Sequence, residues 1–294
     1  MSKKKQIVIG AMILANGTHS ASWLMEEAQP RASTSIDYYR AIAQLAERGK
    51  FDFLMIADTP AAATENLQAW SRSPLYTNVL EPITLLSAVA GATTHIGLGA
   101  TASTSFFEPY NLARRFASLD HISHGRAAWN VVTSANDYAD RNFGLNRLPP
   151  HGERYAKARE FVQVVEALWD TWEDGAFMYD RSACLSFLPE KLHKLDHKVK
   201  YFTVQGALNI ERTPQGRPVI IQAGASDTGR DFATEVAEVV FVPSGTLGKA
   251  REFYQDLKQR MGKFGRHPDD LKIASAISVM IGESEQEARE KLES

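Results

Sequence analysis

The sequence has a single cysteine, no long apolar run and no surplus of positive charge. Cys184 is the only cysteine among 294 residues, so neither an intrachain disulfide nor a cysteine-rich metal site can form. A formal net charge of -2 at pH 7 gives no basic footprint, and we expect no nucleic-acid partner. No segment approaches the ~18 apolar residues of a membrane span. We therefore expect a cytoplasmic protein without a membrane partner.

The sequence also lacks the glycine-rich and serine motifs of several large enzyme classes. It contains no GxSxG, no Walker loop and no GxGxxG. The sequence therefore lacks the main motifs that would indicate a nucleophile-elbow hydrolase, a P-loop enzyme or a nicotinamide Rossmann enzyme. Asp120, His121 and His124 have a spacing that could suit a metal, but they fall at the end of a predicted helix without a further ligand cluster at strand ends. We expect no metal.

The N-terminal segment needs a choice between two interpretations. Lys3 to Lys5, followed by the apolar run 7–15, superficially match a signal peptide. The run contains an early Gly10, stops at Asn16-Gly17 and has no clear cleavage site behind it. We favour a buried strand, because short apolar runs of this kind are typical of parallel sheets.

The rest of the chain alternates short apolar runs with amphipathic segments, which indicates a parallel α/β sheet in one large domain. A hydrophobic fraction of 44% and a charged fraction of 23% are ordinary for such a domain. Seven strands are predicted, at 6–14, 51–57, 96–102, 127–132, 219–223, 239–243 and 273–281. Helices are predicted from 36 up to the stop at Gly49 and at 85–92, 110–122, 155–172, 227–237, 247–264 and 284–292.

Three segments are longer than ordinary connections in such a sheet. The loops 15–31 and 59–78 follow the first two predicted strands, and long loops of this kind tend to be functional. Residues from about 175 to 218 form an insertion with alternating pieces and a charge-rich middle, which we expect to lie over the active-site mouth. The three segments are expected to line the substrate pocket.

Polar residues stand inside or at the ends of several predicted strands. Asn130 interrupts the apolar run 127–132, and a buried amide needs hydrogen-bonding partners. Ser134 follows this strand, Thr101 and Ser103 close the third, and Asp58 follows the second. Such residues can simply cap a helix or satisfy a turn. They can also bind a ligand together, because the ends of parallel strands meet at one edge.

Two further groups have both an ordinary and a functional interpretation. Gly224 to Asp227 lie between a strand and a helix, where backbone N–H groups and the Ser226 hydroxyl could bind a phosphate. Without other information, a simple N-cap at Ser226 is favoured. His151 and Tyr155 lie four residues apart, on one helical face, and could donate to an anionic ligand. On spacing alone, a capped surface turn is favoured there.

Four stretches carry a resemblance to a known family: GRAAWNVVTS (125–134), RNFG (141–144), HGERY (151–155) and QAGASDTGRDFA (222–233). Together they resemble the bacterial luciferase-like flavin monooxygenases, in the branch of the nitrilotriacetate, dibenzothiophene-sulfone and long-chain alkane enzymes. The resemblance runs from about Gln6 to the end. It implies a TIM (β/α)8 barrel formed by residues 1–294 as one domain, and since only seven strands are predicted, the eighth is expected to be missing from these residues.

The resemblance also implies an activity. Such an enzyme takes reduced FMN from solution, reacts it with molecular oxygen to a flavin C4a-hydroperoxide and inserts one oxygen atom into a small organic substrate. A separate NAD(P)H-dependent flavin reductase is the implied partner, and we expect a homo-oligomer, a dimer or a tetramer. Aminopolycarboxylates, organosulfur compounds and alkyl chains are the candidate substrates. The alternatives are an F420-dependent oxidoreductase of the same superfamily and a non-catalytic flavin-binding protein.

Site residues follow from the matched positions of the resemblance. His151 and Asp58 are the residues expected nearest the reactive ring, as catalytic candidates. The phosphate is expected at Ser226 and the helix behind it, on the same side as Tyr155. The complete set expected to bind the flavin is Asp58, Thr101, Ser103, Asn130, Ser134, His151, Tyr155, Ala225 and Ser226.

Overall fold

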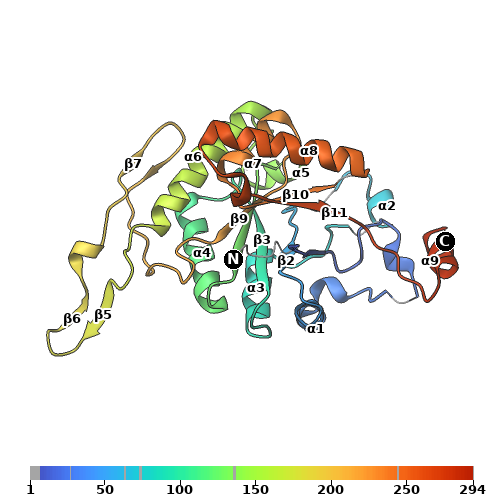
Figure 1. The fold of residues 1–294 in the computed structure, drawn as a ribbon, viewed down its shortest axis with the longest axis horizontal. Coiled ribbons are helices and arrows are strands. Elements are labelled where there is room, and N and C mark those ends of the chain that lie inside the picture. Colours follow the sequence, from blue (N-terminus) through green and yellow to red (C-terminus); the bar gives the residue numbers. More distant parts are fainter. Residues whose placement is uncertain are drawn as a thin grey trace, which may run out of the picture.

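A computed structural model describes residues 7–26, 28–62, 64–72, 75–134, 137–243 and 245–293. Its centre is one sheet of seven parallel strands in the order β1-β2-β3-β4-β9-β10-β11, curved into a barrel with helices outside it (Figure 1). The strands are β1 (Gly10–Ile13), β2 (Phe53–Ile56), β3 (Gly97–Ser103), β4 (Ala127–Val132), β9 (Val219–Gln222), β10 (Val239–Pro243) and β11 (Lys272–Ala276). The predicted TIM-barrel architecture, with seven strands, is confirmed.

Several helices begin at residues whose side chains cap them. The helices are α1 (Ile36–Arg48), α2 (Leu67–Trp70), α3 (Pro82–Ala90), α4 (Pro109–Ser123), α5 (Asp137–Asn142), α6 (His151–Trp169), α7 (Asp227–Val236), α8 (Leu247–Arg260) and α9 (Glu285–Glu293). The Ser35 side chain accepts the Tyr38 N–H at the start of α1, and the Glu81 carboxylate accepts two backbone N–H groups at the start of α3. None of the helices in these ranges is both long and apolar enough to cross a membrane.

Alternation along the strands divides the apolar side chains into two cores. Met55, Ala128, Ile221 and Val239 form a small cluster inside the barrel. The larger cluster lies between the strands and the helices, where the fully buried Trp129 contacts aromatic rings of α4 and α6. Since side chains alternate between the two faces of a strand, Asn130 belongs to the barrel interior, like Ala128 two residues before it.

Two predicted strands are too long at the edges of the sheet. The last was expected to run to Ile281 but ends at Ala276, and Ile277, Val279 and Ile281 are exposed. Among the described residues β11 pairs only with β10, and β1 only with β2, so both edge strands have a partner on one side. Apolar composition alone therefore overestimates the length of these edge strands, because a strand also needs a neighbouring strand with which to form hydrogen bonds. Gln6, the expected start of the first strand, lies outside the described residues.

The segment 175–218 does not lie where the sequence led us to expect it. It carries two small antiparallel sheets, formed by β5 (Phe177–Asp180) with β6 (Leu185–Phe187) and by β7 (His197–Lys198) with β8 (Thr203–Val204). The segment packs against the outside of α6, where Glu160 accepts hydrogen bonds from His197 and from the Tyr201 and Phe202 amides. Figure 1 shows β5 and β6 extending away from the barrel.

The expected position over the barrel mouth is wrong for a topological reason. The segment leaves the end of α6 and leads into β9, so it starts at the face opposite the carboxyl ends of the strands.

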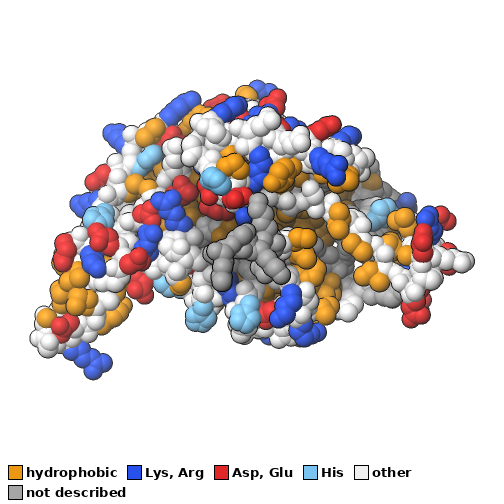
Figure 2. All heavy atoms as spheres, viewed as in Figure 1, with side chains coloured by type: hydrophobic (Ala, Val, Ile, Leu, Met, Phe, Trp, Pro, Cys, Tyr) orange, Lys and Arg blue, Asp and Glu red, His pale blue; other side chains and the backbone are white. Residues whose placement is uncertain are grey.

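In the same view, Figure 2 shows acidic and basic side chains interspersed over the visible surface, in keeping with the low net charge.

Candidate active site

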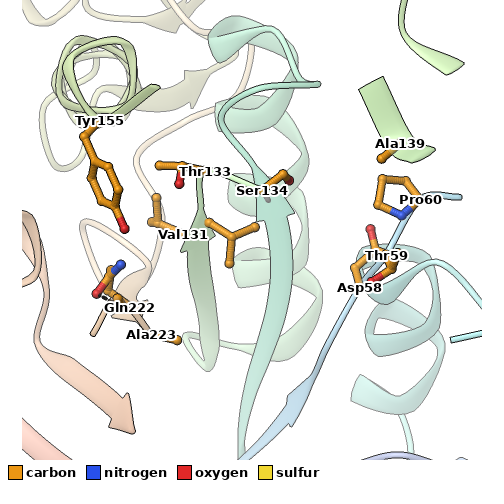
Figure 3. A pocket seen from close by; sticks show the side chains of 12 residues that line it. Asp58, Thr59, Pro60, Val131, Thr133, Ser134, Ala139, Tyr155, Gln222 and Ala223 are labelled. Carbon is orange, nitrogen blue, oxygen red and sulfur yellow. Dashed lines mark hydrogen bonds between the residues drawn. The ribbon is translucent and has the colours of Figure 1, made fainter. Parts of the chain in front are cut away.

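The site is a cavity of about 300 Å³ at the carboxyl ends of β2, β4 and β9 (Figure 3). This volume is at the lower end of the range for small-molecule pockets. The wall also receives Tyr155 from the second turn of α6 and Ala139 from α5. The lining residues are Asp58, Thr59, Pro60, Val131, Val132, Thr133, Ser134, Ala139, Tyr155, Gln222, Ala223 and Gly224.

Asn130 and Thr101 form a polar pair inside the barrel. They are partners in the register of β3 and β4, and the Asn130 Nδ2 donates to the Thr101 Oγ1 over 2.8 Å. Both side chains are buried, and the Asn130 Oδ1 has no hydrogen-bonding partner among the described residues. An orphaned buried carbonyl oxygen costs free energy, so it points to a ligand donor that this structure does not contain.

Ser103 and Ser134 connect the tips of β3 and β4. Their hydroxyl oxygens lie 2.7 Å apart, and Ser134 lines the cavity while Ser103 is buried behind it. Ser134 has a φ of 54°, a left-handed conformation that turns the chain sharply at the end of β4. The Ser105 hydroxyl donates to the Thr133 carbonyl and holds the two strand ends together below this turn.

Asp58 is the acidic residue of the cavity, at the end of β2. Burial, together with the neighbouring Glu81 carboxylate, raises the pKa of its carboxyl from 3.8 to about 6, although a hydrogen bond from the Thr59 amide acts in the opposite direction. A carboxyl group with this pKa exists in both protonation states near neutral pH, so it can give or take a proton at the cavity wall.

A glycine cradle lies at the other end of the cavity, between β9 and α7. A Cβ on Gly224 would lie 2.6 Å from the Gln222 Nε2 and 3.0 Å from the Tyr155 hydroxyl. A Cβ on Gly229 would lie 2.9 Å from the same hydroxyl and 3.1 Å from the Ser226 Oγ. Only glycine permits the chain after β9 to approach α7 and Tyr155 this closely, and the position is bordered by a phenol, an amide and a helix N-terminus, whose donors suit an anion.

Ser226 caps α7 and reaches α6 at the same time. Its Oγ accepts the Gly229 N–H over 3.1 Å and lies 3.3 Å from the His151 Nε2. His151 in turn packs against Tyr155, with ring centroids 4.8 Å apart. The N-cap interpretation is therefore correct, and the same hydroxyl also belongs to a group of donors around the glycine cradle.

The long loop after β2 closes one side of the cavity and is fastened to α5. The Asn142 Nδ2 donates to the Pro60 carbonyl over 3.3 Å, and Arg141 forms an ion pair with Glu65 at 3.6 Å. The neighbouring Phe143 stacks on Phe106, which follows β3, with ring centroids 4.5 Å apart. One wall of the mouth is thus formed by three segments that contact one another: the loop after β2, α5 with the residues that follow it, and the residues after β3.

The expected site residues fall into three groups in space. Asp58, Ser134 and Tyr155 line the cavity, and Thr101, Ser103 and Asn130 support it from the strands. His151, Ala225 and Ser226 lie beside the cradle and outside the lining, and the Ala225 carbonyl accepts the Arg230 Nε. His151 was expected near the reactive ring with Asp58, but the structure places it next to Ser226 at the opposite end of the cavity. The structure thus brings all nine positions to one end of the barrel.

The sequence analysis missed three polar residues of this region. Gln222 was counted as strand, although a polar residue directly before Ala223-Gly224 is itself a signal for the strand tip. Glu81 was noted only at a helix start, and its proximity to Asp58 appears only in the fold. Arg154, within the HGERY stretch, donates to the carbonyl of Ser134, and no spacing rule connects these two positions.

The donors and acceptors of the site fit a flavin mononucleotide. Its phosphate needs donors, which the cradle and the N-terminus of α7 supply. Its ring carries an N–H donor that could satisfy a buried oxygen such as that of Asn130. Within the described ranges, no group of three or more His, Cys, Asp and Glu side chains is placed to hold a metal ion.

Comparison with known proteins shows the family of the chain. Residues 17–294 match the family model described as luciferase-like monooxygenase. The chain belongs to the luciferase-like monooxygenase family. The family resemblance predicted from the sequence is therefore confirmed, including its branch. The chain is 46% identical over 299 residues to component A of nitrilotriacetate monooxygenase from Aminobacter aminovorans, which covers all of this chain and 66% of that protein. The chain thus spans about two thirds of the length of this relative.

Several solved structures have the same fold as this chain. A long-chain alkane monooxygenase superposes with a TM-score of 0.94 at 38% identity, covering 99% of this chain and 68% of that one. A riboflavin lyase solved with a modified FMN gives 0.92 at 33% identity, covering 98% and 66%. A coenzyme F420-dependent tetrahydromethanopterin reductase from Methanopyrus kandleri gives 0.66 at 15% identity over 97% and 69%, so it shares the fold alone.

Proposed function

We propose that this protein is the oxygenase of a two-component flavin system, which receives FMNH2 from a separate NAD(P)H:flavin reductase and transfers one atom of molecular oxygen to a small organic substrate. The observation that carries the proposal is the pairing, at one barrel mouth, of a glycine cradle with a strand-tip polar group that includes the orphaned Asn130 oxygen. Family membership and a relative named for nitrilotriacetate oxygenation support it.

Under this proposal the residues of the chain bind and orient the cofactor, and the bound flavin supplies the oxygen chemistry. Tyr155, Ser226 and the first amides of α7 hold the phosphate, while Asn130 and Ser134 hold the ring. Asp58 holds or releases a proton at the cavity wall, since its pKa of about 6 allows both states. The fastened loop around Pro60 excludes water from that end. How oxygen is activated, and the oligomeric state, stay predictions of the resemblance.

The division into a reductase and an oxygenase is tested with an oxygen electrode. The protein is mixed with FMN, NADH and nitrilotriacetate as a first probe substrate, with and without an unrelated flavin reductase. We expect oxygenated product only when the reductase is present. Product formed without it would contradict the two-component arrangement, and substrate turnover with F420 in the absence of oxygen would favour the F420 alternative. If the protein binds FMN tightly but forms no product from any tested substrate, whichever reductant is supplied, a non-catalytic flavin-binding protein would be favoured.

A further inference from the structure

A chain of hydrogen bonds runs from the residues after β3 to the wall of the cavity. The Ser105 N–H donates to the Ser103 Oγ over 3.1 Å, and the Ser103 Oγ lies 2.7 Å from the Ser134 Oγ. Ser103 is buried and does not line the cavity, whereas Ser134 is one of the lining residues drawn in Figure 3. The chain therefore connects a backbone amide, through a buried hydroxyl, to the space that a ligand would occupy.

The hydrogen-bonding capacity of Ser103 fixes the direction of this chain. A serine hydroxyl has one proton to donate and two lone pairs that accept. One lone pair of Ser103 accepts the Ser105 N–H, and the Ser134 Oγ is the other partner of this hydroxyl among the described residues. If Ser134 donated to Ser103, the buried Ser103 proton would have no acceptor, which costs free energy. The arrangement that satisfies the buried hydroxyl therefore has Ser103 donating to Ser134.

With this direction, the Ser134 proton is left for an acceptor outside the chain. The Ser134 Oγ accepts from Ser103, and within the described ranges no other group is bonded to this hydroxyl. Successive hydrogen bonds polarise one another, so a hydroxyl at the end of such a chain is a better donor than an isolated one. Because Ser134 lines the cavity, its proton is available to an acceptor atom of a ligand there.

The backbone holds Ser134 in place for this role. Its φ of 54° is a left-handed conformation that serine rarely adopts, at the sharp turn after β4. The Ser134 carbonyl accepts a hydrogen bond from Arg154 on α6, while its hydroxyl is bonded to Ser103 on β3. Two neighbouring elements thus anchor this residue, and its hydroxyl has little freedom to turn away from the cavity.

We propose that Ser103 is a positioning residue that makes Ser134 a directed donor, and that Ser134 donates to an acceptor atom of the flavin ring, a carbonyl oxygen or an unprotonated nitrogen. The identity of this ligand rests on the proposed oxygenase function. A flavin ring carries acceptors and an N–H donor at different edges, so a donor at a fixed place accepts one edge and rejects the other. The hydroxyl pair thereby fixes which edge of the ring faces the tip of β4.

The test observes the ring directly, by NMR of oxidised FMN that is isotopically labelled at the carbonyl carbons and the nitrogens of its ring. The variants are Ser134→Ala, Ser103→Ala and Ser103→Cys, the last of which keeps a weak donor of similar size. Ser123→Ala is the matched control. Ser123 is also buried, accepts the Arg126 N–H and donates to the Asp120 carbonyl, but it precedes β4 and so lies at the opposite end of that strand. Circular dichroism and thermal melting verify that each variant folds.

In Ser134→Ala we expect the resonance of one acceptor atom to move toward its value in an apolar solvent. The affinities for FMN and for riboflavin should fall together, by about three- to tenfold, since both ligands contain the ring. Ser103→Ala should move the same resonance in the same direction by a smaller amount and weaken both flavins about two- to threefold, and Ser103→Cys should lose less. In the Ser134→Ala background, Ser103→Ala should have no further effect on flavin affinity. Ser123→Ala should leave the resonances and affinities unchanged.

Four results would overturn the proposal. Ring resonances that Ser134→Ala leaves in place would show that Ser134 does not bind the ring, and an N–H resonance that moves in their stead would show that it accepts. Ring resonances unchanged in Ser103→Ala, or a Ser103→Ala effect on affinity that persists in the Ser134→Ala background, would show that Ser103 does not act through Ser134.

A wild-type protein that bound neither oxidised nor reduced FMN would instead contradict the oxygenase function. The hydroxyl pair could still be tested in the flavin-free protein, by comparing the melting temperatures of the two alanine variants with that of the double variant. We expect the two losses to be non-additive, because the residues share one hydrogen bond. Strictly additive losses would contradict the pairing itself.

Discussion

Replacing Asp58 by asparagine should make the flavin-free protein more stable at neutral pH. The carboxyl has a pKa of about 6 in the folded chain against 3.8 as its ordinary value, so folding disfavours its charged form. A difference of about two pH units corresponds to about 3 kcal/mol, and since the group is only partly buried, solvent screening reduces this to about 1–2 kcal/mol. Asparagine keeps an oxygen that can accept the Thr59 N–H and has no charge to bury.

The sign of the pH dependence follows from the raised pKa. Wild-type protein pays the full desolvation cost above about pH 6, a decreasing part of it between pH 6 and 3.8, and almost none below. Asp58→Asn should therefore melt about 2–3 °C higher than wild type near neutral pH, and this advantage should shrink as the pH falls toward 4. Thermal denaturation followed by circular dichroism at several pH values measures it.

The matched control is Asp37→Asn, because the Asp37 side chain is 91% exposed. Its melting temperature should change little, and by a similar amount at each pH. A stability gain for Asp58→Asn that did not depend on pH, or a loss of stability at neutral pH, would refute the reasoning that burial and Glu81 penalise the Asp58 carboxylate.

Three further predictions concern the glycine cradle and the contact of the 175–218 segment with α6. Ser226→Asp keeps a good N-cap but places a negative charge at the phosphate position, so FMN affinity in a fluorescence titration should fall at least ~10-fold, about 1.4 kcal/mol, while the melting temperature holds. Gly224→Ala puts a methyl group next to the Tyr155 hydroxyl and should also weaken FMN binding about 10-fold. A variant that binds FMN as tightly as wild type would contradict this prediction. Burial alone would raise the pKa of Glu160, but hydrogen bonds from His197 and two amides outweigh it and lower that pKa. Glu160→Gln should therefore cost about 1–3 kcal/mol in urea unfolding at neutral pH, and a cost that did not shrink as acidification protonates wild-type Glu160 would argue against this origin.

The sequence predicted the barrel because its strands and helices carry strong local signals. The run 127–132 is a strand with the bounds expected, and Ser226 and Pro109 begin helices where the cap and proline rules place them. The edges of the sheet were predicted less well, since residues 277–281 are mostly apolar but have no partner strand among the described residues. Periodicity reports which residues could pair and not whether a neighbour exists.

The candidate site was predictable as a set of strand tips but not as a set of contacts. Asn130 was expected to need buried partners, and the structure gives one of them as Thr101. The approach of Glu81 to Asp58 and of Arg154 to Ser134 depends on how α3 and α6 pack against the strands. The 175–218 segment shows a different limit. Its length indicated an excursion, and its place between α6 and β9 puts its ends at the face opposite the carboxyl ends of the strands, while its packing on α6 depends on the hydrogen bonds that Glu160 accepts.

The central claim, that this barrel mouth binds reduced FMN and controls its reaction with oxygen, is tested most directly by stopped-flow absorbance. The protein is mixed anaerobically with FMNH2, and oxygen is then admitted, with free FMNH2 as the reference. The account predicts that the protein changes the course of reoxidation, with an oxygenated flavin intermediate that persists long enough to be observed, and that Ser226→Asp loses this effect at the same flavin concentration. Reoxidation identical to that of free FMNH2, at protein concentrations that saturate binding, would contradict the account.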